Sequence, residues 1–134
     1  MRLSSAFFAE DTEWVDGKLN IIGGGFGSTC VPPGTSEIAV HIVLIFDSVG
    51  EDIGKADVLH IELHGPDGER LPGFRSHSYV VPGNIQLVST GLIALSINPA
   101  GGRHSCVLWT ERHGNCQVAM PLDVNVVDPA TVRH

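Results

Sequence analysis

The chain of 134 residues has few basic, aromatic and cysteine residues. Eight Lys and Arg stand against fifteen Asp and Glu, which gives a formal net charge of −7. The basic residues are scattered and form no run. Nucleic acids and anionic lipid surfaces both bind to basic faces, so the composition argues against both kinds of partner.

The chain also lacks a long apolar segment. Its longest apolar run, residues 42–46, is far shorter than the ~20 residues that a membrane-spanning helix requires. The apolar patch at residues 6–9 is too short for the core of a signal peptide. Three cysteines without such a signal are typical of reduced thiols. We therefore expect a soluble protein of the cytoplasm.

Helical periodicity is the third feature that is missing, since no segment keeps a period of 3.6 residues with a cap at each end. Instead, sixteen glycines and eight prolines interrupt the chain, and apolar residues alternate with polar ones between them. The clearest alternation predicts a strand at residues 116–126, with the even positions buried. The same pattern predicts strands at residues 3–9, 18–22, 37–47, 57–64, 74–81, 89–97 and 104–111.

These segments predict one all-β domain, residues 1–128, followed by a tail at residues 129–134. About eight short strands separated by turn signals are typical of a single antiparallel β-sandwich. Little or no helix is expected beyond a short turn near residues 50–55. A chain of this length buries roughly two-thirds of the surface of its unfolded form, so it needs no disulfide or metal to fold.

The segment at residues 15–28, VDGKLNIIGGGFGS, contains a glycine cluster that raises the question of phosphate binding. A dinucleotide fingerprint needs a third glycine where Ser28 stands, and it must open a helix, which Pro32 and Pro33 exclude. Lys18 precedes the glycines, whereas the lysine of a Walker motif follows them. We therefore expect a tight turn at Asp16-Gly17, a strand, and then a sharp bend at the glycines.

The same stretch resembles the opening signature of a family of small bacterial proteins. Residues 8–11, FAED, and 15–25, VDGKLNIIGGG, are similar to the "AD, then DGKLNIIGGG" opening of that family, although Glu10 replaces its usual aspartate. Residues 102–104, Gly114 and residues 121–124 match its closing hairpin. The family is frequent in actinobacteria and also occurs in their phages. It has no assigned activity, so the resemblance supports the fold and leaves the function open. Its occurrence in phages implies that an assembly component of this kind could have a virion or capsid-accessory role.

A row of polar residues at His60, Glu62 and His64 is the sharpest candidate for a metal site. On a strand the three side chains point to one face, and two imidazoles with a carboxylate could ligate zinc or a similar ion. His41 could join them if the neighbouring strand has a suitable register. The alternative is the solvated face of an amphipathic strand, which alternation alone would produce.

Catalytic and calcium-binding patterns are weaker. Cys106 and Cys116 follow histidines closely but fall on the apolar side of their strands, so we expect both to be inert core residues. No serine lies in a nucleophile elbow. Two acidic clusters lack the spacing of a calcium loop and are expected to be solvated loop charge. They comprise Glu10, Asp11, Glu13 and Asp16, and Asp47, Glu51 and Asp52.

Two tryptophans remain as candidate contacts for a protein partner. Trp14 stands among acidic residues, and Trp109 is expected on the outer face of its strand beside Val107, opposite the inward His104, Cys106 and Leu108. Exposed tryptophans concentrate binding energy at interfaces, whereas covered ones are merely core. We therefore expect a non-enzymatic interaction or structural module without a cofactor, located in the cytoplasm or, if phage-encoded, in a virion. The alternative is a metal-binding or small-ligand-binding protein centred on His60, Glu62 and His64.

Overall fold

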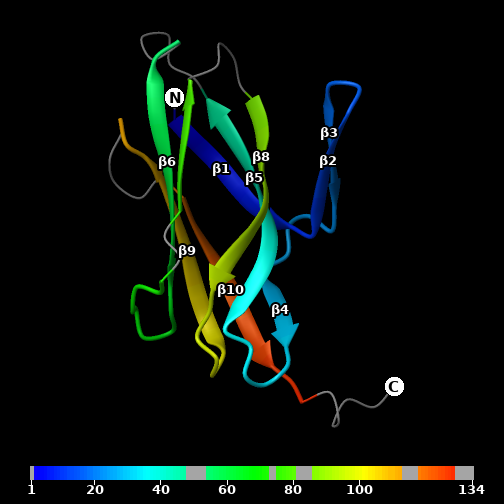
Figure 1. Ribbon diagram of the computed structural model, residues 1–134, viewed down its shortest axis with the longest axis vertical. Helices are drawn as coiled ribbons and strands as arrows, with labels where there is room; N and C mark the ends of the chain where they lie inside the picture. The colour runs from blue at the N-terminus through cyan, green and yellow to red at the C-terminus, as the bar shows by residue number, and fades with distance from the viewer. Residues whose placement is uncertain (1, 48–53, 73–74, 81–85, 113–117, 129–134) are drawn as a thin grey trace.

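The computed structural model describes residues 2–47, 54–72, 75–80, 86–112 and 118–128, and within these ranges it contains strands and no helix (Figure 1). None of the described residues therefore forms a helix that could cross a membrane. The all-β prediction is confirmed. The strands are β1 (Arg2–Ala9), β2 (Asp11–Val15), β3 (Lys18–Ile22), β4 (Ser28–Val31), β5 (Glu37–Asp47), β6 (Ala56–His64), β7 (Arg75–Val80), β8 (Gln86–Ser96), β9 (Gly102–Thr110) and β10 (Val118–Val126).

Two sheets face each other across the core. One has three strands in the order β1-β5-β8, and the other has five in the order β4-β10-β9-β6-β7. The strands β2 and β3 form a separate two-stranded sheet. The arrangement differs from a single antiparallel sandwich in two details, because this third sheet stands beside the other two and because β4 runs parallel to β10.

Two strands, β2 and β4, were not predicted. The sequence of β2, DTEWV, places its tryptophan and valine side by side rather than in alternation, and β4 has only 4 residues. Neither pattern is long enough to distinguish a strand from a loop. The predicted turn near residues 50–55 lies mostly outside the described residues, and the predicted tail at residues 129–134 lies wholly outside them.

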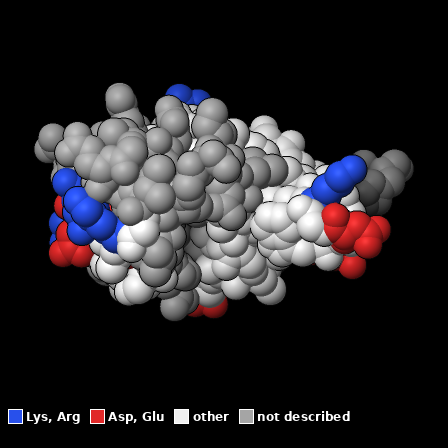
Figure 2. Space-filling model, turned by 90° about the horizontal axis from the view of Figure 1, so that it is seen from above, with Lys and Arg blue, Asp and Glu red and all other residues white. Residues whose placement is uncertain are grey.

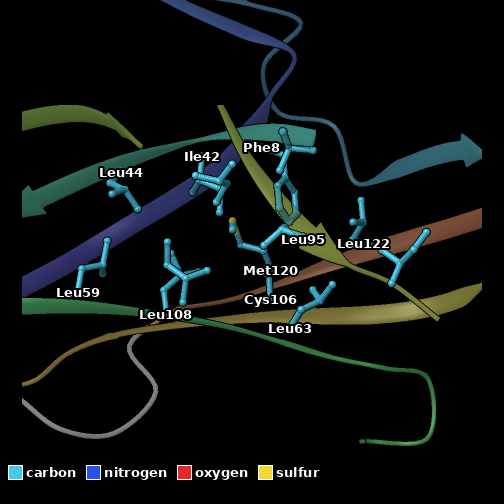
Figure 3. Packing of buried hydrophobic residues seen from close by; sticks show 14 of the residues in the cluster. Phe8, Ile42, Leu44, Leu59, Leu63, Leu95, Cys106, Leu108, Met120 and Leu122 are labelled. Atoms are coloured by element: carbon cyan, nitrogen blue, oxygen red, sulfur yellow. The ribbon is translucent and has the colours of Figure 1, made fainter. Parts of the chain in front are cut away.

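Alternating side chains of the two sheets meet in one core (Figure 3). The three-stranded sheet contributes Phe8, Ile42 and Leu95, and the five-stranded sheet contributes Leu108 and Leu122, all at most 2% exposed. Burial of each such side chain stabilises the fold by roughly 1.5–3 kcal/mol. The predicted inward set of β9, which is His104, Cys106 and Leu108, is confirmed, since all three residues are fully buried.

The central strand β5 is buried on both faces. Ile42 faces the core, whereas His41 and Val43 alternate with it, are also buried, and lie outside the main core cluster. An outer face of a sandwich is normally solvated. Its burial here requires a cover, which the β2–β3 hairpin supplies, since β2 contacts both β5 and β8 and β3 contacts β8.

Candidate functional site

The β2–β3 hairpin, residues 11–22, forms an arm at one side of the molecule (Figure 1). Its strands pair in register from Asp11 with Ile22 to Val15 with Lys18. At the tip, Asp16 and Gly17 have φ of 50° and 75°. Positive φ at both central residues is typical of the two-residue turn that joins antiparallel strands, and Asp-Gly is a preferred pair for it. The predicted tight turn is confirmed.

Glycines return the chain from the arm to the body. Gly23 and Gly25 have φ of 61° and 81°, values that residues with a side chain rarely adopt. Gly24 has no room for a side chain, because an added Cβ would lie 2.9 Å from Ile21 Cγ2 and 3.1 Å from Phe7 Cε2. The glycine cluster is therefore a bend after a strand, as predicted. Since no helix follows it, the geometry of a nucleotide-binding loop is absent from these described residues.

A partly buried hydrogen-bonded group fastens the arm to the three-stranded sheet. Thr12 Oγ1 of the arm lies 2.8 Å from His41 Nδ1 and 2.7 Å from Ser89 Oγ. On the other side of the ring, His41 Nε2 lies 3.5 Å from Asp11 Oδ1. We call Asp11, Thr12, His41 and Ser89 the anchor. The anchor joins β2 to both β5 and β8, so it fixes the position of the arm's first residues.

A β-bulge in β8 sets the geometry of the anchor. The pairing of β5 with β8 shifts register between His41 and Val43, whose partners are Leu92 and Ser89. Gly91 lies within the bulge with φ of 72°, and its N–H donates to Ser89 Oγ at 3.0 Å. Bulges re-aim side chains. This one orients the Ser89 hydroxyl towards the arm.

Large exposed apolar side chains gather around this arm. Of the five that the described residues contain, Trp14, Val15 and Ile22 belong to the arm, and Leu92 pairs with His41 of the anchor. Trp14 is 55% exposed and Ile22 is 57% exposed. Trp14 lies on the face of the hairpin that Thr12 turns towards the body, and Val15 and Ile22 lie on the opposite face, because successive side chains alternate. The arm thus carries exposed apolar side chains on both faces.

Acidic side chains surround these apolar ones. The exposed carboxylates Glu10, Asp11, Glu13 and Asp16 lie along the arm, with Lys18 as the basic residue of its two strands. Figure 2 shows acidic side chains gathered on the part of the molecule that projects to one side, next to a basic group. These four carboxylates are exposed, as predicted, but Asp11 and Glu13 lie in β2 rather than in a loop. Its position around exposed apolar groups makes the arm an amphipathic, negatively charged projection.

The three residues proposed for a metal site do not converge. Glu62 is buried, contacts Arg70, and lies 2.9 Å from His64 Nε2. His60 instead lies 3.1 Å from Ser76 Oγ through its Nδ1. No group of three His, Cys, Asp or Glu side chains that could hold a metal ion occurs in the described part of the chain. His41, the proposed fourth ligand, belongs to the anchor instead.

The alternative prediction of a solvated strand face is also wrong for Glu62, which is only 4% exposed. Its carboxylate is covered because Arg70, from the segment that follows β6, reaches back over the strand. Charge pairing with Arg70 and hydrogen bonding to His64 compensate for the loss of water around the carboxylate. Glu62, His64 and Arg70 therefore satisfy one another's polar groups, rather than forming an open polar face on this part of the sheet.

Trp109 points away from the core beside Val107, as the alternation predicted, but both side chains are half-buried. The indole ring of Trp109 stacks on the imidazole of His60, with ring centroids 5.2 Å apart and an interplanar angle of 23°. Stacking covers part of the surface that a partner would use. Of the three residues proposed for partner binding, Trp14 is therefore the most exposed.

The predicted inert character of Cys106 agrees with its environment, because its thiol is fully buried between the sheets. Burial disfavours the thiolate and raises the pKa of Cys106 to about 12. Cys30 is exposed on β4. Cys116 lies outside the described residues.

We expect iodoacetamide at about pH 8 to alkylate Cys30 and to leave Cys106 unmodified in the folded protein, because only thiolates react. Peptide mass spectrometry of the modified protein would locate the label. Repeating the reaction in a denaturant provides the control, since unfolding exposes both thiols. Rapid labelling of Cys106 under native conditions would contradict the buried position of its thiol.

Asp57 is a buried polar residue that the sequence pattern did not single out. Its Oδ1 accepts hydrogen bonds from Val58 N at 2.8 Å and from Arg112 N at 3.1 Å, which ties the end of β9 to the start of β6. Its Oδ2 has no hydrogen-bond partner among the described residues, and Asp57 is one of the residues that line a cavity of about 290 Å³. A cavity of this size has room for water. The role of Asp57 is therefore structural.

No protein-family model matches the chain, and no curated protein matches it either. The resemblance of its opening signature to a bacterial and phage family stays a prediction.

Proposed function

We propose that the protein is a non-enzymatic interaction module that binds a protein partner through its β2–β3 arm. The observation that carries the proposal is the concentration of exposed apolar side chains there. Trp14, Val15, Ile22 and Leu92 belong to the arm or its anchored end, whereas Val126, the remaining large exposed apolar residue of the described part, lies in β10. Clusters of this kind typically mark interaction surfaces.

The construction of the arm supports this proposal. An isolated two-stranded hairpin is only marginally stable in water. A hairpin that served only to cover its own sheet would need apolar side chains on one face, yet Val15 and Ile22 are exposed on the other face. A partner that packs against both faces would bury Trp14 together with these two residues. Tryptophan is among the residues that contribute most to binding energy.

The charge of the arm indicates the chemistry of the partner. Four exposed carboxylates surround the apolar residues of the arm. Complementary charge steers association and discriminates between partners. The surface that fits the arm is therefore an apolar cleft with a rim of Lys and Arg. An assembly component of a virion, which the resemblance in the sequence favours, is one setting for such a contact.

Replacement of Trp14 by alanine tests the proposal. We expect Trp14→Ala to weaken partner binding by about 2 kcal/mol or more, which is roughly 30-fold in Kd. The fold is expected to stay intact, because Trp14 lies outside the core. Partners would be captured from a lysate of the source organism on immobilised wild-type protein and then titrated against both proteins, while sedimentation measures self-association.

Val126→Ala is the matched control, because it removes an exposed apolar side chain from β10, a strand outside the arm. It should leave the affinity unchanged. Trp109→Ala provides a second comparison. If Trp109→Ala weakens binding and Trp14→Ala does not, the binding surface is the outer face of the five-stranded sheet and the arm proposal fails.

A further inference from the structure

One half of β10 has an open edge. On one side, residues 118–124 of β10 pair with β9. On the other side, β4 pairs only with residues 123–126. Beside Ala119 and Pro121, the described part of the chain therefore provides no neighbouring strand on that side.

Backbone N–H and C=O groups in this half of β10 point into the open position. Asp123 N donates a hydrogen bond to Gly27 O at 2.9 Å, on the side where β4 lies. Alternate residues of a strand direct their backbone groups to the same side, so Ala119 and Pro121 do the same. Ala119 presents an N–H and a carbonyl group there. Pro121 presents only its carbonyl, and proline is tolerated in a strand where its missing N–H is not needed for pairing.

A groove of about 550 Å³ lies along this edge. Ala119, Met120 and Pro121 of β10 form one wall, and Ser5 and Ala6 of β1 form the opposite wall. Phe26 lines the end next to β4, where its ring stacks on Phe8 with ring centroids 5.6 Å apart. The groove is therefore bounded by two strands and closed at one end by the chain that enters β4.

We propose that this groove binds an uncharged, extended segment of a partner protein, which adds to β10 as a strand in line with β4. Strand addition to an open sheet edge is a common mode of peptide recognition, in which backbone hydrogen bonds supply affinity. The chain's own β4 already pairs with the other half of the same edge, so this edge accepts a parallel strand at residues 123–126. The groove is separate from the arm, and the proposal does not depend on the arm's function.

The lining determines the chemistry of the segment. None of the described residues that line the groove carries a charge, although the chain as a whole has a net charge of −7. A charged side chain in the segment would lose water without gaining a partner. The open part of β10, residues 119–121, corresponds to a segment of about three residues, or roughly 10 Å of extended chain. Apolar side chains of the bound segment that face Phe8 and Met120 would extend the hydrophobic core.

The test uses the acetylated and amidated hexapeptide Thr-Val-Thr-Val-Thr-Val as a probe of the groove in the full chain. We expect millimolar peptide to slow hydrogen exchange of the Ala119 amide by about tenfold or more, as measured by NMR. The same peptide N-methylated at every residue should have no effect, because it cannot form the ladder. Ala119→Ser should preserve the protection, whereas Ala119→Pro, which removes the groove's N–H, should abolish binding of the peptide.

Several outcomes would overturn the proposal. One is the absence of protection at about 5 mM peptide, a concentration that detects even weak binding. Another is equal binding of the N-methylated peptide. A third is protection of Ala119 that rises with the protein's own concentration without peptide, which would assign the groove to a second copy of the chain. Ala119→Ser and the N-methylated peptide keep the test decisive even if Ala119→Pro does not fold.

Discussion

Phe8→Ala is expected to lower the free energy of unfolding by about 3–5 kcal/mol, because it removes a fully packed aromatic ring and leaves a cavity. Phe8 is 1% exposed and stacks on Phe26. Its carbonyl also accepts a hydrogen bond from Gly25 N at 2.8 Å. The loss would take a large share of the 5–15 kcal/mol that typically stabilises a domain. Urea denaturation of the two proteins measures the difference.

Phe7→Ala is the matched control for this prediction. Phe7 is the same residue type on the same strand, but it is half-buried and faces Gly24 at the base of the arm. We expect a smaller cost of about 1–2 kcal/mol, since less apolar surface is involved. An equal cost for the two substitutions would show that the base of the arm is packed as tightly as the core. The distinction between core and arm would then be wrong.

Phe8 also connects the core to both proposed binding surfaces. Through Phe26 it positions the end of the groove beside β10, and through Gly25 it holds the chain that returns from the arm. The two surfaces are therefore built on one rigid part of the sandwich. Binding sites on such a rigid scaffold are held more precisely than sites on free loops.

The sequence predicted features that depend on local alternation. Period-two patterns correctly placed His104, Cys106 and Leu108 inside and turned Val107 and Trp109 outward, because a strand repeats its orientation every two residues. The tight turn and the glycine bend were also predictable, since few residue types tolerate positive φ. These are properties of residues that are close together in the chain.

Features that depend on distant contacts were not predictable. The burial of Glu62 results from Arg70, and the burial of β5 on its outer face results from the arm. The anchor joins Thr12 to His41 and Ser89, which lie 29 and 77 residues further along the chain. A bulge at Gly91 sets its geometry, and no periodic pattern reveals which residues a bulge brings together. Likewise, the open edge of β10 is recognised only from the pairing of β4, which begins at Asp123 of β10 and leaves the preceding residues of that strand without this neighbour.

His41→Ala is expected to lower the free energy of unfolding by about 2–4 kcal/mol, because it removes a buried ring and leaves the Thr12 hydroxyl without one of its partners. The arm should also open more often, since only the bond between Thr12 and Ser89 would remain of the anchor's contacts with the sheet. Hydrogen exchange of the amides of Glu13 and Asn20, which pair across the arm, measures this opening, alongside urea denaturation.

A double-mutant cycle separates the anchor from simple packing. Thr12→Val keeps the shape of the side chain but removes its hydroxyl, and alone it should cost about 1–2 kcal/mol. If His41 and Thr12 act as one unit, the double variant should cost less than the sum of the two single variants by about 1 kcal/mol. Strict additivity, with exchange in the arm unchanged by either substitution, would contradict the anchor. Faster exchange confined to the arm would instead show that the anchor holds the arm, and with it Trp14, in place.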